Sequence, residues 1–294
     1  MIFSPELRNA LEAAVSGAVG KFRLEHLTPV GGGCIHQCFV IEGGGRRYFA
    51  KLNERTRLDC FAAEADGLAA LAKAGARVPV VLGLGDTGEQ SFLVLEHLEL
   101  RPEGDCAGLG RMLAAVHSLR GEFCGWHRHN FIGTTPQANP RCASWCEFWR
   151  DARLGPQLVL AARNGLGGSL VRKGERLAAE LARLLPEGLP PAALLHGDLW
   201  RGNAAFLADG SPVLFDPAVY FGDREADLAM TELFGGFPRE FYSTYREAEP
   251  LDPGYETRKT LYNLYHVLNH ANLFGGGYAA QAERMIESLL AELR

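Results

Sequence analysis

Long apolar runs and clusters of basic residues are both missing from this chain of 294 residues. No segment reaches the roughly 18 consecutive apolar residues of a spanning helix, and the N-terminus has no basic region followed by an apolar stretch. We therefore expect no membrane association and a cytoplasmic location. The net charge is −5 and basic residues are scattered, which argues against a nucleic-acid partner. A hydrophobic content of 47% is typical of a globular protein.

Several familiar functional motifs are also missing. The seven cysteines include no Cys-x-x-Cys pair, which excludes a zinc ribbon and a secreted disulfide framework. There is no Gly-x-Ser-x-Gly elbow of a hydrolase. The triple glycine at 31–33 lacks the Gly-Lys-Ser/Thr ending of a Walker motif, which disfavours a mononucleotide-binding α/β fold.

Three polar residues in the second half of the chain have the spacing that phosphoryl transfer requires. Asp198 follows the apolar start of the segment 194–203, and Asn203 follows five residues later. A second apolar run ends at Asp216, thirteen residues beyond Asn203. One carboxylate can accept the proton of an attacking hydroxyl, while an amide oxygen and a second carboxylate hold Mg²⁺ on the phosphates. Taken singly, the same residues would be turn- or helix-capping groups on the surface.

The N-terminal region predicts a small sheet with a glycine turn. We expect strands at 22–30, 37–42 and 47–52, with Gly31, Gly32 and Gly33 after the first strand and Lys51 on the third. Helices are predicted at 5–19 and 59–74, and a further one at 144–164. Glycines allow the backbone to approach phosphates closely, and Lys51 would reach the α- and β-phosphates. A flexible turn and a solvated edge-strand lysine are the alternatives.

The longer motifs narrow the interpretation. The segments 196–203, 216–220 and 222–236 resemble the fructosamine (ketosamine) 3-kinase family, within the aminoglycoside-phosphotransferase branch of the protein-kinase-like fold. The resemblance continues through 261–266 and 269–278 and covers nearly the whole chain. It implies a bilobal α+β fold. A small antiparallel sheet with one key helix is expected over residues 1–98, and a larger, mainly helical lobe over 99–294.

The resemblance also implies ATP and Mg²⁺ as cofactors and gives each site residue a role. Asp198 is the expected catalytic base, and Asn203 and Asp216 are the expected metal ligands. Glu64, in the predicted helix, would pair with Lys51 in preference to Asp66. The full ATP-binding set is expected to include the glycine turn, this pair and the hinge: Gly31, Gly32, Gly33, Lys51, Glu64, Glu96, His97 and Leu98.

Trp200 and His270 are the candidate substrate residues. Trp200, two residues after the expected base, could stack on a sugar ring, or it could be an aromatic that packs the lobes together. His270 is a weaker candidate, as are Tyr220, His266 and Asn269, because core histidines bonded to backbone carbonyls are common.

Cys34 is a candidate redox switch. Backbone amides of the preceding glycines would favour its thiolate, and oxidation could link two chains. A small residue tolerated in a turn is the alternative. The chain is therefore expected to be a monomer or a homodimer.

Three functions follow. The first is an ATP-dependent kinase that phosphorylates the sugar O3 of fructosamine or ribulosamine adducts, in deglycation and protein repair. The second is a small-molecule kinase of the aminoglycoside or choline type, and the third is a nucleotide-binding regulator without catalysis. The sequence does not distinguish among ketosamine sugars, or between free and protein-bound adducts.

Overall fold

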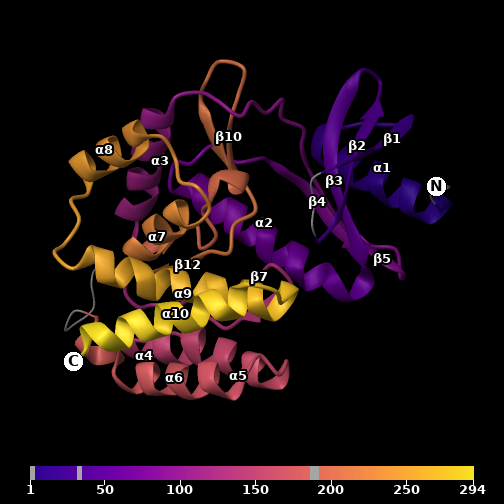
Figure 1. Ribbon diagram of the computed structural model, residues 1–294. Coiled ribbons are helices and arrows are strands. Elements are labelled where there is room, and N and C mark those ends of the chain that lie inside the picture. The colour runs from indigo at the N-terminus through magenta and orange to yellow at the C-terminus, as the bar shows by residue number, and fades with distance from the viewer. Residues whose placement is uncertain (1–3, 32–34, 186–191) are drawn as a thin grey trace.

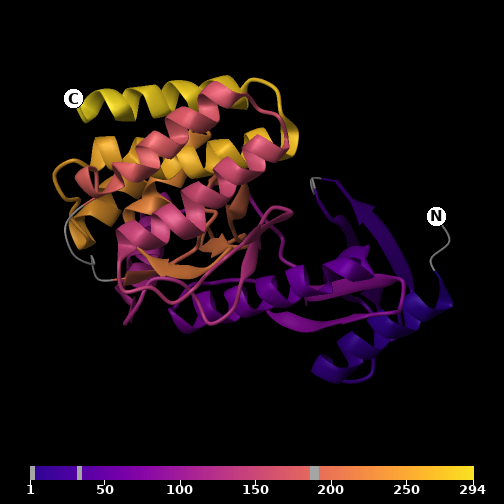
Figure 2. The same cartoon turned by 90° about the horizontal axis from the view of Figure 1, so that it is seen from below.

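The computed structural model describes residues 4–31, 35–185 and 192–294. Figures 1 and 2 show an antiparallel sheet with two helices beside a larger, mainly helical part. The bilobal α+β fold expected from the sequence is thereby confirmed. A lobe boundary at residues 98 and 99 stays a prediction. Gly32, Gly33 and Cys34, to which a phosphate-binding and a redox role were assigned, lie outside the described residues.

The N-terminal sheet places Lys51 at its centre. Its five antiparallel strands follow the order β1-β2-β3-β5-β4. They are β1 (His26–Val30), β2 (Gln37–Gly43), β3 (Arg46–Glu54), β4 (Val81–Asp86) and β5 (Gln90–Glu96). Lys51 of β3 has Cys38 of β2 on one side and Leu93 of β5 on the other. The edge-strand alternative for Lys51 is therefore wrong. The strand predicted at 22–30 is shorter than expected, since it begins at His26.

Helix α1 (Pro5–Val19) has the sequence features of an isolated amphipathic helix. The Ser4 side chain accepts a hydrogen bond from the Leu7 amide at the first turn, and Pro5 suits the first helical position. Leu7, Leu11 and Val15 are fully buried against the sheet. Each buried side chain of this size contributes roughly 1.5–3 kcal/mol relative to an exposed one.

Helix α2 (Leu58–Lys73) joins the two lobes. Phe61, Leu68 and Leu71 are buried in a cluster that also contains residues of the catalytic region. A Cβ on Gly67 would lie 3.0 Å from the Pro217 ring, so a glycine lets the helix approach the 216–220 segment closely. The position of α2 is thus tied to the segment that follows Asp216.

The larger lobe is built from eight α-helices of the described residues. Its first long helix is α3 (Cys106–Ser118), and a π-helical turn at Arg150–Leu154 divides the single helix that the sequence predicts at 144–164. The remaining helices are α4 (Trp145–Trp149), α5 (Gly155–Arg163), α6 (Gly168–Ala179), α7 (Glu225–Leu233), α8 (Arg239–Ala248), α9 (Tyr255–Phe274) and α10 (Tyr278–Glu292). Figure 1 shows α9 and α10 side by side above α5 and α6.

Three small antiparallel sheets, which the sequence analysis did not predict, position the polar residues of this lobe. The strands β12 (Tyr220–Gly222), β9 (Ala192–Leu195) and β6 (Arg120–Gly121) form one sheet. A second sheet pairs β10 (Ala204–Phe206) with β11 (Pro212–Leu214). The third is a hairpin of β7 (Asn130–Ile132) and β8 (Thr135–Gln137). All these strands have four residues or fewer, too short for an alternating pattern to stand out.

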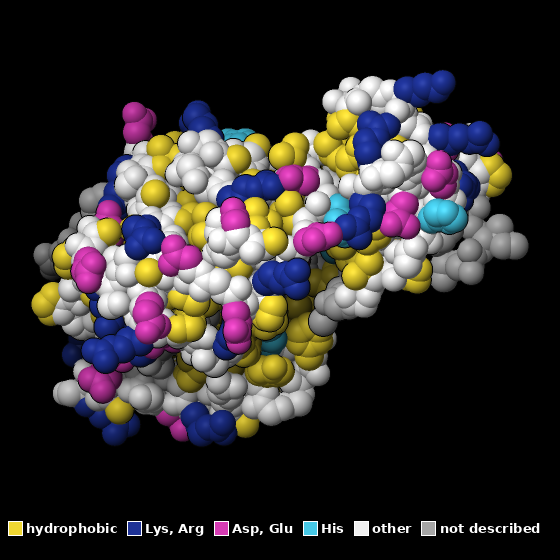
Figure 3. All heavy atoms as spheres, turned by 90° about the horizontal axis from the view of Figure 1, so that it is seen from above, with side chains coloured by type: hydrophobic (Ala, Val, Ile, Leu, Met, Phe, Trp, Pro, Cys, Tyr) yellow, Lys and Arg dark blue, Asp and Glu magenta, His cyan; other side chains and the backbone are white. Residues whose placement is uncertain are grey.

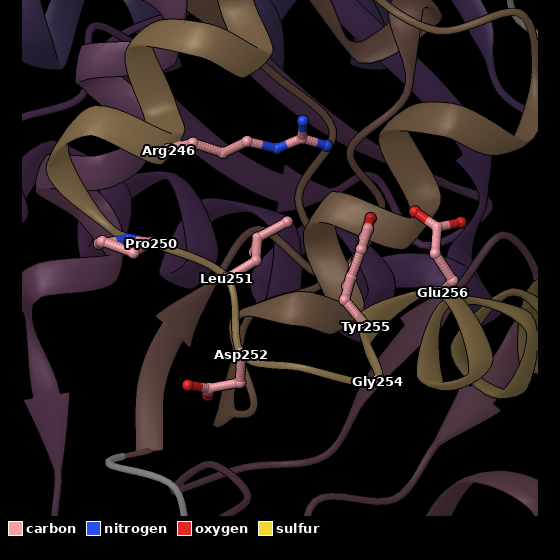
Figure 4. A pocket seen from close by; sticks show the side chains of 7 residues that line it. All are labelled: Arg246, Pro250, Leu251, Asp252, Gly254, Tyr255 and Glu256. Atoms are coloured by element: carbon pink, nitrogen blue, oxygen red, sulfur yellow. The ribbon is translucent and has the colours of Figure 1, made fainter.

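The surface agrees with the scattered charges of the sequence. Figure 3 shows basic and acidic side chains interspersed over the face seen from above. No helix of the described residues is long and apolar enough to cross a membrane. A hollow between the end of α8 and the start of α9 is drawn in Figure 4, lined by Arg246, Leu251, Tyr255 and Glu256 among others. None of the predicted site residues lines it.

Candidate active site

The loop that carries Asp198 is held by a buried aspartate. Strand β9 ends at Leu195, and the backbone N–H groups of His196 and Gly197 donate to the Asp227 carboxylate at 2.6 and 2.8 Å. Gly197 has φ of 81°, and a Cβ there would lie 2.1 Å from the Ala218 carbonyl oxygen. Only glycine fits this turn. Asp227 therefore stabilises the loop that carries Asp198.

Asn203 is brought directly to Asp198. Its Nδ2 donates to the Asp198 backbone carbonyl at 2.8 Å and to Oδ2 of the Asp198 carboxylate at 3.1 Å. Burial, and next the neighbouring carboxylate of Asp216, raise the pKa of Asp198 to about 7. A carboxylate with a pKa near neutrality is suited to general-base catalysis at physiological pH.

Three charged side chains from distant parts of the chain form the charged cluster: Lys51, Glu64 and Asp216. The Lys51 Nζ donates to Glu64 Oε1 at 2.7 Å and also to the Asp216 carboxylate. Burial favours the neutral amine, but the two carboxylates outweigh it and raise the pKa of Lys51 above its usual value. Lys51 is therefore a fixed positive charge at the point where the two lobes meet.

Asn203 and Asp216 fit the donor set of a magnesium site that is completed by phosphates. Because Asn203 uses its Nδ2 group on Asp198, its Oδ1 is the atom left to face a cation. Asp216 has φ of 55°, the only positive value for a non-glycine residue in the described ranges. No group of three or more His, Cys, Asp or Glu side chains in those ranges forms a metal site. Two oxygen ligands plus substrate phosphates match the way Mg²⁺ is usually bound by kinases.

The sequence analysis missed a second attachment of α2. Asp66 accepts a hydrogen bond from the indole Nε1 of Trp126 at 2.7 Å, and Nε2 of His127 lies 3.1 Å from its other oxygen. Asp66, two residues after Glu64, thus binds the helix to the larger lobe instead of pairing with Lys51. Trp126 is visible in the sequence as a residue whose indole N–H needs an acceptor, but that acceptor, Asp66, lies 60 residues away and could not be identified from the sequence.

The predicted hinge residues follow β5. Glu96, His97 and Leu98 are all half-buried. The Glu96 amide donates to the Val80 carbonyl at 2.8 Å, and its carboxylate forms a bidentate pair with Arg77 at 2.6 and 2.8 Å. A contact from Glu96 to an adenine edge would therefore use its carbonyl oxygen.

Trp200 lies next to other aromatic side chains. It is 37% exposed, and its ring makes an edge contact with Phe234 at 5.8 Å between centroids. Phe234 in turn contacts the half-buried His270 at 5.0 Å. Both candidate substrate residues thus belong to one partly open aromatic group.

The weaker substrate candidates are parts of the core instead. Tyr220, His266 and Asn269 are 3%, 5% and 2% exposed. Burial lowers the pKa of His266 to about 3, so this histidine is neutral. His266 is therefore a buried core residue, whereas the contact with a backbone carbonyl that the alternative described is made by His270, whose Nδ1 lies 2.8 Å from the His266 carbonyl oxygen.

Known proteins resemble this chain over its full length. A family model described as fructosamine kinase matches residues 8–292. A probable ketoamine kinase of Synechocystis is 45% identical and covers 98% of both chains. A chloroplastic protein-ribulosamine 3-kinase of rice is 40% identical over 92% of this chain and 81% of its own.

Solved structures give the same result. A crystal structure named as a fructosamine-3-kinase of Haemophilus somnus superposes with a TM-score of 0.87 at 30% identity, covering 95% of this chain and 96% of that one. An aminoglycoside phosphotransferase bound to ADP and hygromycin B reaches a TM-score of 0.62 at 15% identity, covering 97% of this chain and 98% of its own, and so shares the fold. With its catalytic loop, its charged cluster and these relatives, the chain belongs to the fructosamine kinase family.

Proposed function

We propose that this protein is an ATP-dependent kinase that phosphorylates the sugar O3 of ketosamines and so starts their removal from amines. The observation that supports this most directly is the convergence of Asp198, Asn203, Asp216 and Lys51 in one place. The family relatives named for ketoamines and ribulosamines supply the substrate class. We place the reaction in the cytoplasm.

Each residue has a separate task in this reaction. Asp198 holds the substrate hydroxyl and accepts its proton as the oxygen attacks the γ-phosphorus of ATP. Lys51, fixed by Glu64, pairs with phosphate oxygens and neutralises their charge. Asn203 and Asp216 would hold Mg²⁺, which when bound offsets the charge of the β- and γ-phosphates. Lys51 also pairs with Asp216, so phosphate oxygens would compete with this carboxylate for the lysine.

The aromatic group beside the catalytic loop suits the sugar. Trp200 follows Asp198 by two residues, and its exposed ring offers an apolar face for stacking. We assign Trp200 to the ketose ring and His270 to the adjoining part of the adduct. The glycines at 31–33 would hold the triphosphate, and the hinge at 96–98 would hold the adenine.

The test is phosphorylation of four acceptors with ATP and Mg²⁺. A fructose–amine adduct, a ribulose–amine adduct, choline and an aminoglycoside would be compared, with Asp198→Asn as the control. We expect turnover of the ketosamines alone, lost in the variant. Turnover of choline or the aminoglycoside would favour the alternative kinase, and nucleotide binding without any turnover would favour a regulator.

A further inference from the structure

Two buried amides hold the backbone that follows Asp216. Asn130 of β7 donates from Nδ2 to the Val219 carbonyl at 2.8 Å. Gln137 of β8 donates from Nε2 to the Ala218 carbonyl at 3.3 Å. The two side chains are 4% and 2% exposed. The β7–β8 hairpin is thus bonded to the second and third residues after the proposed metal ligand.

The orientation of both amides is fixed by their other bonds. Oδ1 of Asn130 accepts from Gln137 Nε2 and from Asn139 Nδ2, both at 2.8 Å. Since two donors face this oxygen, the opposite end of Asn130 must be the NH₂ group that faces Val219. The Tyr265 hydroxyl donates to Gln137 Oε1 at 2.7 Å. Satisfied buried networks of this kind are rigid, and breaking one leaves a buried group without a partner.

A buried cation stands at the base of these bonds. Arg153 lies in the π-helical turn, is 0% exposed and donates to Asn139 Oδ1 at 2.7 Å. Its guanidinium sits 4.0 Å from the Tyr220 ring centroid and 4.6 Å from that of Phe148. Among the described residues Arg153 forms no ion pair with a carboxylate: its two Nη groups donate to carbonyl and amide oxygens, and its Nε has no hydrogen-bond partner. Burying a charge without an ionic partner costs free energy, so packing alone does not account for an arginine at this position.

The backbone conformation of Asp216 indicates what these buried bonds do. A non-glycine residue at φ of 55° is strained and persists only where its neighbours hold it. The loop that carries Asp198 holds one amide on each side of Asp216, through Phe215 N to Asn203 O at 3.1 Å and Ala218 N to His196 O at 2.8 Å. The hairpin holds the carbonyls of Ala218 and Val219. Without the hairpin donors, the segment is free to relax on that side.

We propose that Asn130, Gln137, Asn139, Arg153 and Tyr265, here named the amide network, position Asp216 for metal binding. None of them is placed at the nucleotide or the sugar, so they are positioning residues and not catalytic ones. The inference rests on the proposed function, because it concerns the metal-bound nucleotide of that reaction. It assigns a task to a hairpin that the kinase chemistry itself does not use.

The test compares nucleotide binding with and without metal. Asn130→Ala and Gln137→Met each remove one donor to the 216–220 segment, together with that side chain's bonds inside the network, and Ser91→Ala serves as the control. Ser91 is 0% exposed and also donates to a backbone carbonyl, that of Glu54 at 2.7 Å, but it lies in β5 of the N-terminal sheet. A fluorescent non-hydrolysable ATP analogue would be titrated against each protein in EDTA and in Mg²⁺. The Kd in EDTA divided by the Kd in Mg²⁺ measures how much the metal increases the affinity for the nucleotide.

We expect this ratio to fall about tenfold in Asn130→Ala, which removes the donor to Val219 and also the acceptor that Gln137 and Asn139 share. Gln137→Met should lower it by about threefold, in keeping with its longer bond to the segment. Affinity in EDTA should stay within about twofold of wild type, and the half-saturating Mg²⁺ for turnover should rise while kcat at saturating Mg²⁺ recovers. Ser91→Ala should lower Tm and leave the ratio unchanged.

Several results would overturn the inference. An unchanged ratio in Asn130→Ala and Gln137→Met, with Tm lowered as in the control, would make the network purely structural. If Asn130→Ala does not fold, Gln137→Met decides alone. A ratio reduced equally in Ser91→Ala would also refute it. Failure of the proposed function looks different, because the wild-type protein would then show no metal-dependent nucleotide binding at all.

Discussion

The charged cluster and the amide network both contact the 216–220 segment, but one consists of charged side chains and the other mostly of neutral ones. The charged cluster sets one cation between two carboxylates where the lobes meet. The amide network is mostly neutral, lies wholly inside the larger lobe and ends on backbone carbonyls. Charge is needed where phosphates arrive, whereas neutral donors fix a backbone without altering the field at the metal. The comparison separates groups that perform chemistry from groups that hold them in place.

The largest effect is expected at Asp198, which belongs to neither group. Asp198→Asn should reduce kcat by roughly 10²–10⁴, because general-base assistance is lost. The same variant should raise Tm at pH 8 without nucleotide. The pKa of Asp198, raised to about 7, means that its proton is bound more tightly in the folded state. The stability this provides is present below the usual value of 3.8 and lost as pH rises towards 7.

Steady-state kinetics and thermal melts at pH 8 and pH 3.5 would check both parts. The gain in Tm should be present at pH 8 and shrink at pH 3.5, where the carboxyl is protonated in the folded state and mostly protonated in the unfolded state. An active or destabilised Asp198→Asn protein at pH 8 would contradict the role assigned to this residue.

The charged cluster can be broken at its cation. Lys51→Met should lower kcat/KM by roughly 10²–10³, as expected for one lost electrostatic contact to the transition state. It should also lower Tm, since the Glu64 and Asp216 carboxylates then face each other without a counter-charge. Adding Glu64→Gln should restore Tm but not activity. Excess Mg²⁺ should restore the activity of the amide-network variants but not that of Lys51→Met. If it restored Lys51→Met as well, the charged cluster and the amide network would not have different roles.

The pH profile should sharpen the role of Asp198. With a pKa of about 7, the carboxylate form that accepts a proton decreases as pH falls through neutrality. We expect kcat/KM to drop about tenfold from pH 8 to pH 6. Measurement of kcat/KM against pH at saturating Mg²⁺ would check this. A profile that stays flat over that range would exclude Asp198 as the titrating base.

The smallest effect is expected at the second attachment of α2. Asp66→Asn weakens the hydrogen bond from Trp126 and the contact with His127, both of which lie at a partly exposed surface. A loss of about 1 kcal/mol corresponds to roughly fivefold in the KM for ATP, with kcat changed less. Trp126→Phe, which removes the same donor, should give a similar change and should add little to Asp66→Asn. Independent, additive effects in the double variant would rule out this link.

The sequence predicted elements whose determinants are local. Helix α1 has a cap, a proline and apolar residues one turn apart, and its predicted bounds match the observed Pro5–Val19. Asp198, Asn203 and Asp216 were found because a catalytic loop and the following hairpin keep them within 19 residues of one another. The pairing of Lys51 with Glu64 followed from the family resemblance, and the structure contains it.

The amide network escaped prediction for a physical reason. Asn130 and Gln137 lie in strands of three residues. In a sequence, polar residues in so short a segment look like part of a solvent-exposed loop. Their partners at Val219 and Ala218 are backbone atoms more than 80 residues away, and backbone acceptors have no signature in a sequence. The helix predicted at 144–164 likewise missed the π turn that holds Arg153, because such turns are rare, short and enclosed by α-helix on both sides.

One measurement tests the central claim most directly: ³¹P and proton NMR of the product formed from a fructose–lysine adduct, ATP and Mg²⁺. The account predicts a single phosphomonoester on the sugar O3, formed one-for-one with ADP and absent with Asp198→Asn. Phosphate on another hydroxyl, or ADP formed without any sugar ester, would contradict it.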